Sequence, residues 1–426
     1  MFAARLSPWL LQRGIHYGWV MVGLTFLNAV CSSAATTLPG VLLLPMSQEF
    51  GWGRGDIAGA MGLMLTLFAL MAPFAGATIL RYGLRHVVVG AAGVSTVALL
   101  LVTQATAQWH LWLGFGLLGA AAGIVALSLS ATVASRWFVQ RRGLAMGVLT
   151  AAFAAGQLVF VPTTAWLASA HGWRMAVLPV VISCALAAVL YVLFARNWPA
   201  DLGLPPYGED RIQPPEAASA SNAVALSLSV LREAAATRVF WILAGTFFIC
   251  GLSTTGIVNQ HFIPFCADNG VGAVVAASFL AMIGIFNFIG TIASGWLSDR
   301  FDNRMLLAWY YSLRGLALIW LPFSNFDLFS LTLFAVFFGL DYVATVPPTA
   351  KLAALHFGPV KAPIVFGWAF ASHQLGGAVS AAAAGISRDA LASYLPAFFT
   401  IGLTCVLAAA AVFALRDIRP AARKAA

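Results

Sequence analysis

The stretch Gly295-Trp-Leu-Ser-Asp-Arg-Phe-Asp-Asn-Arg304 indicates how this chain is expected to fold. It closes one long apolar segment, and the next apolar segment begins directly after it. A weaker copy, Gly76-Ala-Thr-Ile-Leu-Arg-Tyr-Gly-Leu-Arg85, closes an apolar segment in the first half of the chain. Three residues of the copies align at one constant offset, close to half of the chain length: Gly76, Arg81 and Arg85 with Gly295, Arg300 and Arg304.

A second pair of similar segments supports this duplication. Ala155-Gly-Gln-Leu158 resembles Ser372-His-Gln-Leu375 at nearly the same offset. Duplication of a six-helix unit is the pattern of membrane carriers that expose a central site alternately to the two sides.

The composition indicates a membrane protein. Of 426 residues, 61% are hydrophobic and 9% are charged, whereas about a quarter of a soluble protein is charged. A membrane-spanning helix needs about 20 mostly apolar residues. Such segments are predicted near 18–39, 56–77, 87–106, 110–134, 143–169, 175–195, 239–263, 273–297, 305–324, 328–350, 362–386 and 392–415. We therefore expect an all-α polytopic membrane protein with twelve transmembrane helices in two pseudo-symmetric six-helix bundles.

The basic residues predict the orientation. The net charge is +9. Alternate loops, which lie on one side of the membrane, contain almost all of the basic residues, and the loops on the other side contain only Arg54, Arg174 and Arg388. Cytoplasmic loops of membrane proteins carry such an excess of Lys and Arg. Both termini are therefore expected in the cytoplasm, the first helix is expected to stay uncleaved, and no nucleic-acid partner is needed to explain the charge.

The longest polar interruption divides the chain into three parts. The predicted parts are an N-terminal bundle over 1–196, a cytoplasmic linker over 197–238 and a C-terminal bundle over 239–426. The linker is rich in proline, alanine and serine. An amphipathic surface helix is expected around Leu226–Glu233.

The remaining sequence patterns exclude several functions. The five cysteines lack metal-ligand spacing, so neither a metal site nor a disulfide framework is expected. No phosphate-binding Gly-rich loop and no nucleophile–base arrangement is recognised. The chain is expected to be a non-enzymatic protein without a cofactor, embedded in a lipid bilayer as a monomer.

The motif at Gly295–Arg304 resembles the loop signature of the major facilitator superfamily, between helices two and three and again between eight and nine. Leu80 replaces the usual aspartate in the first copy, and Asp302 replaces a common glycine in the second. The resemblance covers essentially the whole chain and implies the major facilitator fold. It implies a gating role for the residues of both copies: Gly76, Arg81, Gly83, Arg85, Gly295, Asp299, Arg300 and Arg304. The alternative is that the arginines only anchor the topology.

Polar groups at membrane depth are the candidates for substrate contact, because each ionisable group there costs about 2–3 kcal/mol. The first half offers Asn28 and Gln157. The second half offers more, namely Asn259, His261, Asn287, Asp341, Tyr342, His373 and Gln374. We expect Gln157 and Gln374 to converge across the pseudo-symmetry on a small polar substrate.

Arg314 and Asp341 have two interpretations. They can pair and join helices nine and ten, or Arg314 can attract an anionic substrate while Asp341 exchanges partners or protons. The resemblance places helix nine outside the cavity and helix ten along it, which favours a structural role for Arg314 and leaves Asp341 a site candidate. His373 is either a substrate or proton site or a neutral interhelix residue.

Three further stretches resemble the monocarboxylate and oxalate–formate carriers: His16-Tyr-Gly-Trp-Val-Met-Val22, Arg136-Trp-Phe-Val-Gln-Arg-Arg-Gly-Leu-Ala-Met-Gly147 and His171-Gly-Trp-Arg174. This implies secondary transport of a small organic anion, coupled to protons or to an exchanged anion, across a bacterial inner membrane. The expected basic residues of helices eight and eleven are replaced by Asn287 and His373. The alternatives are a proton-driven multidrug or hydrophobic-compound exporter and a transporter-like receptor without turnover.

Overall fold

The computed structural model describes residues 2–125, 127–212 and 220–415, and the described part is built almost entirely of helices. The first half contains α1 (Phe2–Leu11), α2 (Gly18–Phe50), α3 (Arg54–Met71), η1 (Ala72–Phe74), α4 (Ala75–Tyr82), α5 (Leu84–Thr103), α6 (Gln108–Val125), α7 (Leu127–Trp137), α8 (Arg142–His171), α9 (Trp173–Phe194) and η2 (Pro199–Leu202). The second contains α10 (Ala220–Ala235), α11 (Arg238–Gly251), η3 (Leu252–Val258), α12 (Asn259–Asp268), α13 (Ala273–Ser298), α14 (Asn303–Trp320), η4 (Leu321–Phe323), α15 (Leu328–Asp341), α16 (Val346–Leu391) and α17 (Leu395–Val412).

Eleven spans in the described residues are long and apolar enough to cross a membrane. The twelfth expected span, 362–386, is helical as well, as the second part of α16 after a non-helical break at Gly358. Large apolar side chains face outward along these helices, including Val97, Ile182 and Leu407, each more than 60% exposed. Lipid is the environment in which such exposure is favourable.

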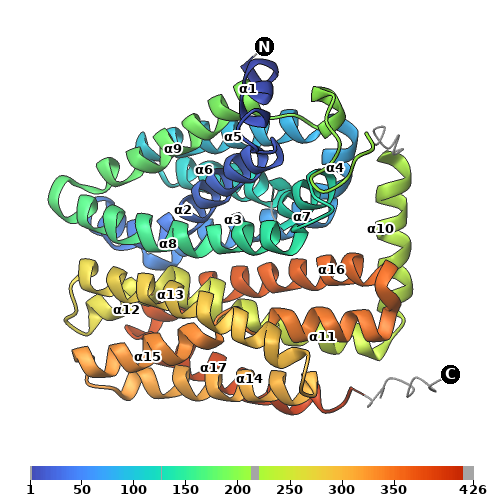
Figure 1. Ribbon diagram of the computed structural model, residues 1–426. Helices are drawn as coiled ribbons and strands as arrows, with labels where there is room; N and C mark the ends of the chain where they lie inside the picture. Colours follow the sequence, from blue (N-terminus) through green and yellow to red (C-terminus); the bar gives the residue numbers. More distant parts are fainter. Residues whose placement is uncertain (1, 126, 213–219, 416–426) are drawn as a thin grey trace.

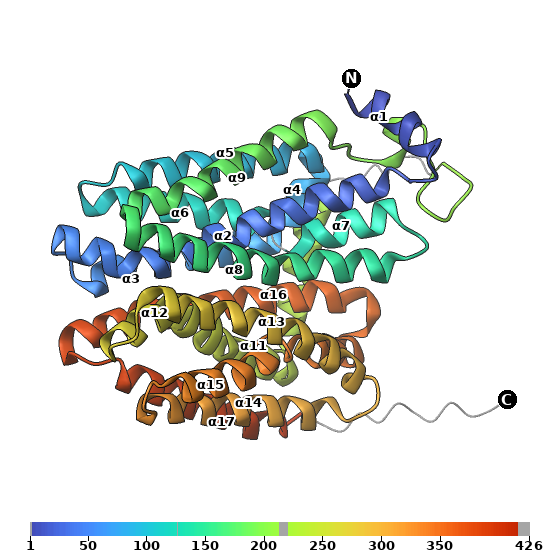
Figure 2. The same cartoon turned by 60° about the vertical axis from the view of Figure 1, so that its left-hand side comes forward.

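The two halves lie against each other along paired helices. Figure 1 shows α1–α9 in the upper layer and α11–α17 in the lower layer, and the view in Figure 2 agrees. Across this boundary α3 packs on α16, α8 packs on α13, and α2 packs on α12. These six helices supply most of the surface that the two halves bury against each other.

The linker helix α10 touches both halves. It packs on α4 of the first half and on α11 and α16 of the second, and it stands at one end of the molecule (Figure 1). Trp368 Nε1 donates to the Ser227 carbonyl at 3.3 Å, and Lys361 pairs with Glu233 at 2.7 Å. We call this end the linker end, and the opposite end, where α3 begins and α12 finishes, the far end.

Two helices depart from the simple spans that the sequence predicts. The first span continues beyond residue 39 to Phe50, although it contains Pro39 and Pro45, and it finishes at Gly51 with φ of 66°. The span expected at 328–350 is broken after Asp341, where four turn residues separate α15 from α16. Proline is tolerated in membrane helices where neighbouring groups satisfy the freed carbonyls.

Candidate functional site between the two halves

A small cavity lies at the centre of the boundary between the halves. It is lined from α2, α8, α12 and α13 by Thr37, Val41, Gln157, Val161, Asn259, Ile263, Leu280 and Ile283. Its volume is about 10 Å³, close to the smallest space that holds one water molecule. In this conformation the helices are therefore closed around the site.

Two amides, one from each half, meet in this cavity. Gln157 Nε2 on α8 donates to Asn259 Oδ1 on α12 at 3.4 Å. The hydroxyl of Tyr342 lies near both amides, and it is buried without a hydrogen-bond partner in the described chain. Gln157 and Asn259 are thus the two amides of a lining that is otherwise aliphatic apart from Thr37. We call these two residues and the neighbouring Tyr342 the amide centre.

A wide helical turn positions Asn259. The segment η3 is a π-helix directly before it, and π-helical turns leave an extra residue in the helix and change the direction of those that follow. The Ser380 hydroxyl donates to the Leu252 carbonyl of this turn at 2.8 Å. At Gly251, an added Cβ would collide with the His373 carbonyl on α16, so glycine permits the close contact of these helices.

The break in the tenth span is held by Arg314. Pro347 and Pro348 cannot donate to carbonyls in the preceding turn, and the chain leaves the helix there. Arg314 Nη2 donates to the carbonyls of Asp341 and Tyr342 at 2.6 and 3.2 Å. The guanidinium therefore caps the broken helix from α14.

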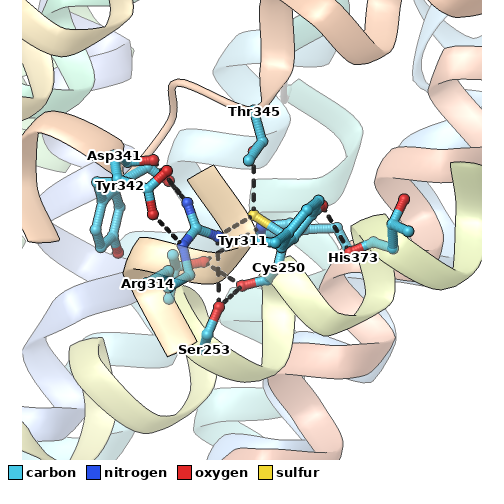
Figure 3. A network of polar contacts seen from close by, with 10 residues as sticks. Cys250, Ser253, Tyr311, Arg314, Asp341, Tyr342, Thr345 and His373 are labelled. Atoms are coloured by element: carbon cyan, nitrogen blue, oxygen red, sulfur yellow. Dashed lines mark hydrogen bonds and ion pairs between the residues drawn. The ribbon is translucent and has the colours of Figure 1, made fainter. Parts of the chain in front are cut away.

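Arg314 also forms a buried ion pair. Its Nε lies 2.7 Å from Asp341 Oδ2, and the two side chains are 0% and 5% exposed. Nη1 donates to Cys250 Sγ at 2.9 Å and to Ser253 at 3.4 Å, as Figure 3 shows. All three guanidinium nitrogens are thus engaged by the chain itself.

His373 joins the edge of this network. Its Nε2 lies 3.4 Å from the Thr254 hydroxyl, and its ring stacks on Phe370 with centroids 5.7 Å apart. Its Nδ1 lies 3.4 Å from Gln374 Oε1. The partner of Gln157 across the boundary is therefore Asn259, whereas the expected convergence of Gln157 and Gln374 is replaced by a local Gln374–His373 contact.

The other sequence candidates lie outside the lining of the cavity. His261 is fully buried, with Nε2 2.7 Å from the Ala381 carbonyl and Nδ1 3.4 Å from the Tyr394 hydroxyl. Asn287 accepts a hydrogen bond from Thr291 at 3.1 Å. Asn28 is buried within α2.

A network of charges joins the halves at the far end. Asp268 at the end of α12 receives Arg54 Nη2 from α3 at 2.9 Å and Arg388 Nε from α16 at 2.6 Å. Asp389 accepts from the backbone N–H groups of Arg54 and Gly55 at 3.0 and 2.5 Å. We call these charges the far-end network. The sequence reasoning missed it, and the clustering of four charges in three loops on one predicted side was the available signal.

The loop motif of the second half makes contacts within its own half. Asp299 pairs with Lys351 of α16 at 2.8 Å, and Lys351 also donates to the Ser298 carbonyl at 2.7 Å. Its charged partner lowers the pKa of Asp299. Arg300 lies over the Trp296 ring at 4.0 Å. The motif thus connects α13 to α16 at the linker end.

Asp302 and Arg304 complete this loop. Asp302 caps α14 by accepting from the Arg304 N–H at 2.9 Å, and its carboxylate pairs with Arg304 Nη2 at 2.7 Å. Arg304 also donates to the Leu415 carbonyl at 3.1 Å. A Cβ added at Gly295 would meet no other atom within 4 Å.

The copy in the first half is held by an amide instead of an aspartate. The Arg85 N–H donates to Asn197 Oδ1 at 3.0 Å, and its guanidinium donates to the Val192 carbonyl. Gly83 has a φ of 80°, and a Cβ added there would lie 2.8 Å from the Asn197 side chain. Arg81 lies over the Tyr82 ring at 5.2 Å, and Gly76 faces open space.

Comparison with known proteins identifies similar chains. Residues 25–381 match the family model of the Major Facilitator Superfamily. The chain is 27% identical over 387 residues to an uncharacterized MFS-type transporter, YcxA, of Bacillus subtilis, covering 88% of this chain and 90% of the relative. It is 24% identical over 395 residues to monocarboxylate transporter 13 of Rattus norvegicus, covering 91% and 86%.

A solved structure is similar in fold. It is a bacterial homologue of the human lysosomal transporter Spinster, in an inward-facing and unoccupied conformation. The TM-score is 0.72 at 15% identity, over 93% of this chain and 96% of the other.

Proposed function

Because this chain belongs to the major facilitator superfamily, and is therefore an integral membrane transporter and not an enzyme, we propose that its cargo is a small monocarboxylic acid. Net movement of the anion is coupled to protons or to an exchanged anion. The amide centre carries this proposal, because it is a polar site between the halves in a chain similar to proteins named monocarboxylate transporters.

The arrangement of charges supports transport by alternating access. The far-end network joins α3 to α12 and α16, and Gln260 Nε2 on α12 donates to the Thr36 carbonyl on α2 at 3.3 Å. These contacts close one access route between the halves. We infer that the network separates when the site opens to that side, and that the loop motifs at the linker end bias the opposite movement.

We assign Arg314 and Asp341 a positioning role. Their pair fixes the break between α15 and α16 and so holds Tyr342 beside Gln157 and Asn259. A cation exporter needs an acidic group free to receive its cargo. Since one Asp341 oxygen and its backbone carbonyl both accept from Arg314, the carboxylate is already paired, which favours the acid carrier over the exporter.

The protein is placed by this proposal in a bacterial inner membrane as a monomer, with both termini in the cytoplasm. The orientation rests on the loop charges. Protease protection of a tag on either terminus in right-side-out vesicles tests it, and cleavage from the outside contradicts it.

Transport is tested with purified protein in proteoliposomes. Vesicles preloaded with unlabelled lactate, butyrate or oxalate are diluted into the labelled acid, with and without an imposed pH gradient. Protein-dependent counterflow of a monocarboxylate is expected, and protein-free vesicles give the diffusive background. If only lipophilic cationic dyes move in parallel assays, the organic-acid proposal fails.

A further inference from the structure

The amide centre retains one unused amide nitrogen, one unused amide oxygen and one hydroxyl for a ligand. Gln157 Nε2 is used on Asn259 Oδ1, which leaves Gln157 Oε1, Asn259 Nδ2 and the Tyr342 hydroxyl. Exchanging O and N in both amides leaves the same set, because each amide carries one acceptor oxygen and one donor nitrogen. The set therefore does not depend on how the amides were oriented.

The lining carries no charge among the described residues. Its eight residues are two amides, one threonine and five aliphatic side chains. Arg314, the buried cation closest in sequence to Tyr342, donates through all three nitrogens to the chain itself. Arg54 and Arg388, the cations of the far-end network, are paired with Asp268.

A carboxylate fits such a site poorly. It accepts hydrogen bonds only, so it would set lone pairs against the free amide oxygen, and burying it without a cation is costly. A protonated carboxyl group matches the set, since its O–H can donate to the amide oxygen while its carbonyl accepts from the amide N–H₂. The aliphatic side chains then face the hydrocarbon part of the acid.

We propose that the amide centre binds the carboxyl group of a short aliphatic monocarboxylic acid in its protonated, uncharged form. The coupled proton crosses as the O–H of the cargo, without a titrating side chain. The anion gains one proton in water on the entry side, and the acid returns it to water on the exit side. This inference rests on the proposed function and adds the ionic state of the substrate.

Uncharged and charged substrate analogues provide the test. Protein-dependent counterflow of labelled butyrate is measured with butyramide or 1-propanesulfonate as competitor, since both carry the propyl group of butyrate. Butyramide keeps a carbonyl and an N–H donor without charge, whereas the sulfonate stays anionic. We expect butyramide to inhibit at concentrations at least about tenfold below those required of propanesulfonate, corresponding to about 1.4 kcal/mol.

Inhibition by propanesulfonate at equal or lower concentration overturns the proposal, and so does the absence of inhibition by butyramide. In either case the proposed function stands, because butyrate still moves. If no monocarboxylate shows protein-dependent counterflow, the proposed function itself fails.

Matched variants assign the effect to the site. Gln157→Leu and Asn259→Leu each remove an amide, and we expect each to raise the butyramide concentration for half-inhibition by about tenfold or more. Gln104→Leu makes the same change at an exposed position at the end of α5 and is expected to leave it unchanged. Inhibition that is unaltered in both site variants places binding elsewhere and refutes the proposal. Should a site variant fail to fold, Gln157→Asn, which withdraws the amide by one methylene, replaces Gln157→Leu.

Discussion

Replacing Arg314 by methionine is expected to destabilise the protein more than replacing any single exposed charged residue. The variant leaves the Asp341 carboxylate buried without its cation and leaves the Tyr342 carbonyl without its donor. Removing one partner of a buried ion pair costs about 3–5 kcal/mol. Asp341→Leu is expected near the lower end of this range, because the carbonyls of residues 341 and 342 can still accept from Arg314.

The double variant separates the ion pair from the helix break. With Arg314→Met and Asp341→Leu together no charge is left unpaired, and the remaining cost is that of the uncapped carbonyls, about 1–3 kcal/mol for each one left buried and unsatisfied. The double variant should therefore be more stable than Arg314→Met alone. Arg314→Lys keeps the charge but cannot span the carboxylate and both carbonyls from one nitrogen, so it should fall between the wild type and Arg314→Met.

The assay is denaturant unfolding of the purified protein in detergent micelles, followed by tryptophan fluorescence, for the wild type, both single variants and the double variant. Strong positive coupling is the expected result, with the double variant several kcal/mol more stable than the sum of the two single losses predicts. Additive losses would refute the ion pair as the source of the coupling. Wild-type stability of the double variant, or a wild-type midpoint for Arg314→Met, would refute the assignment of Arg314 as the cap of the broken helix.

Three further predictions follow from contacts across and within the halves. Asp268→Asn should weaken the far-end network and so raise the rate at which an impermeant maleimide labels Thr37→Cys in the cavity. The rate should rise about fivefold if the free-energy difference between the closed and opened conformations falls by about 1 kcal/mol. An unchanged rate would contradict the assignment of the network as a closure. Gly290→Ala should abolish folding, because the added methyl group meets the backbone of a neighbouring helix. The control Gly147→Ala faces open space and should be neutral or slightly stabilising. Size-exclusion chromatography measures both, and equal profiles for the two variants would contradict this prediction. Ser294→Ala removes the 2.5 Å bond to a carbonyl in the break of the tenth span and should lower the unfolding free energy by about 1 kcal/mol, measured against Ser278→Ala on the same helix as the control; equal losses in both would count against it.

The spans are readable from the sequence because they follow from a constraint that acts on every residue of a span, and the duplication is readable because two pairs of motifs repeat at nearly one offset. A helix in lipid must be apolar over its whole length, so composition alone locates α13 or α17. The ion pair was one of two interpretations, since a charge at membrane depth needs a partner and Arg314 and Asp341 lie on consecutive spans. What could not be read is that Arg314 also caps a broken helix, because the fold of residues 342–345 depends on which carbonyls find donors.

The composition of the amide centre was only partly readable. Gln157, Asn259 and Tyr342 were all candidates because polar groups are rare in these spans. The pairing of Gln157 with Asn259 depends on the π-helical turn before Asn259, and that turn depends on close packing at Gly251 and on the hydroxyl of Ser380. Symmetry in the sequence favoured Gln374, since repeated residues indicate equivalent positions but not equivalent directions of their side chains.

The bonds that join the two halves are weaker at the amide centre than in the far-end network. The contacts of the amide centre and of Gln260 with Thr36 are neutral and long, at 3.4 and 3.3 Å. The far-end network is charged and shorter, with distances of 2.5–3.0 Å, and charge-assisted bonds are about twice as strong as neutral ones. The far-end network therefore contributes more to closure than the contacts at the centre do. The two amides can exchange their weak mutual bond for a substrate without first breaking a strong one.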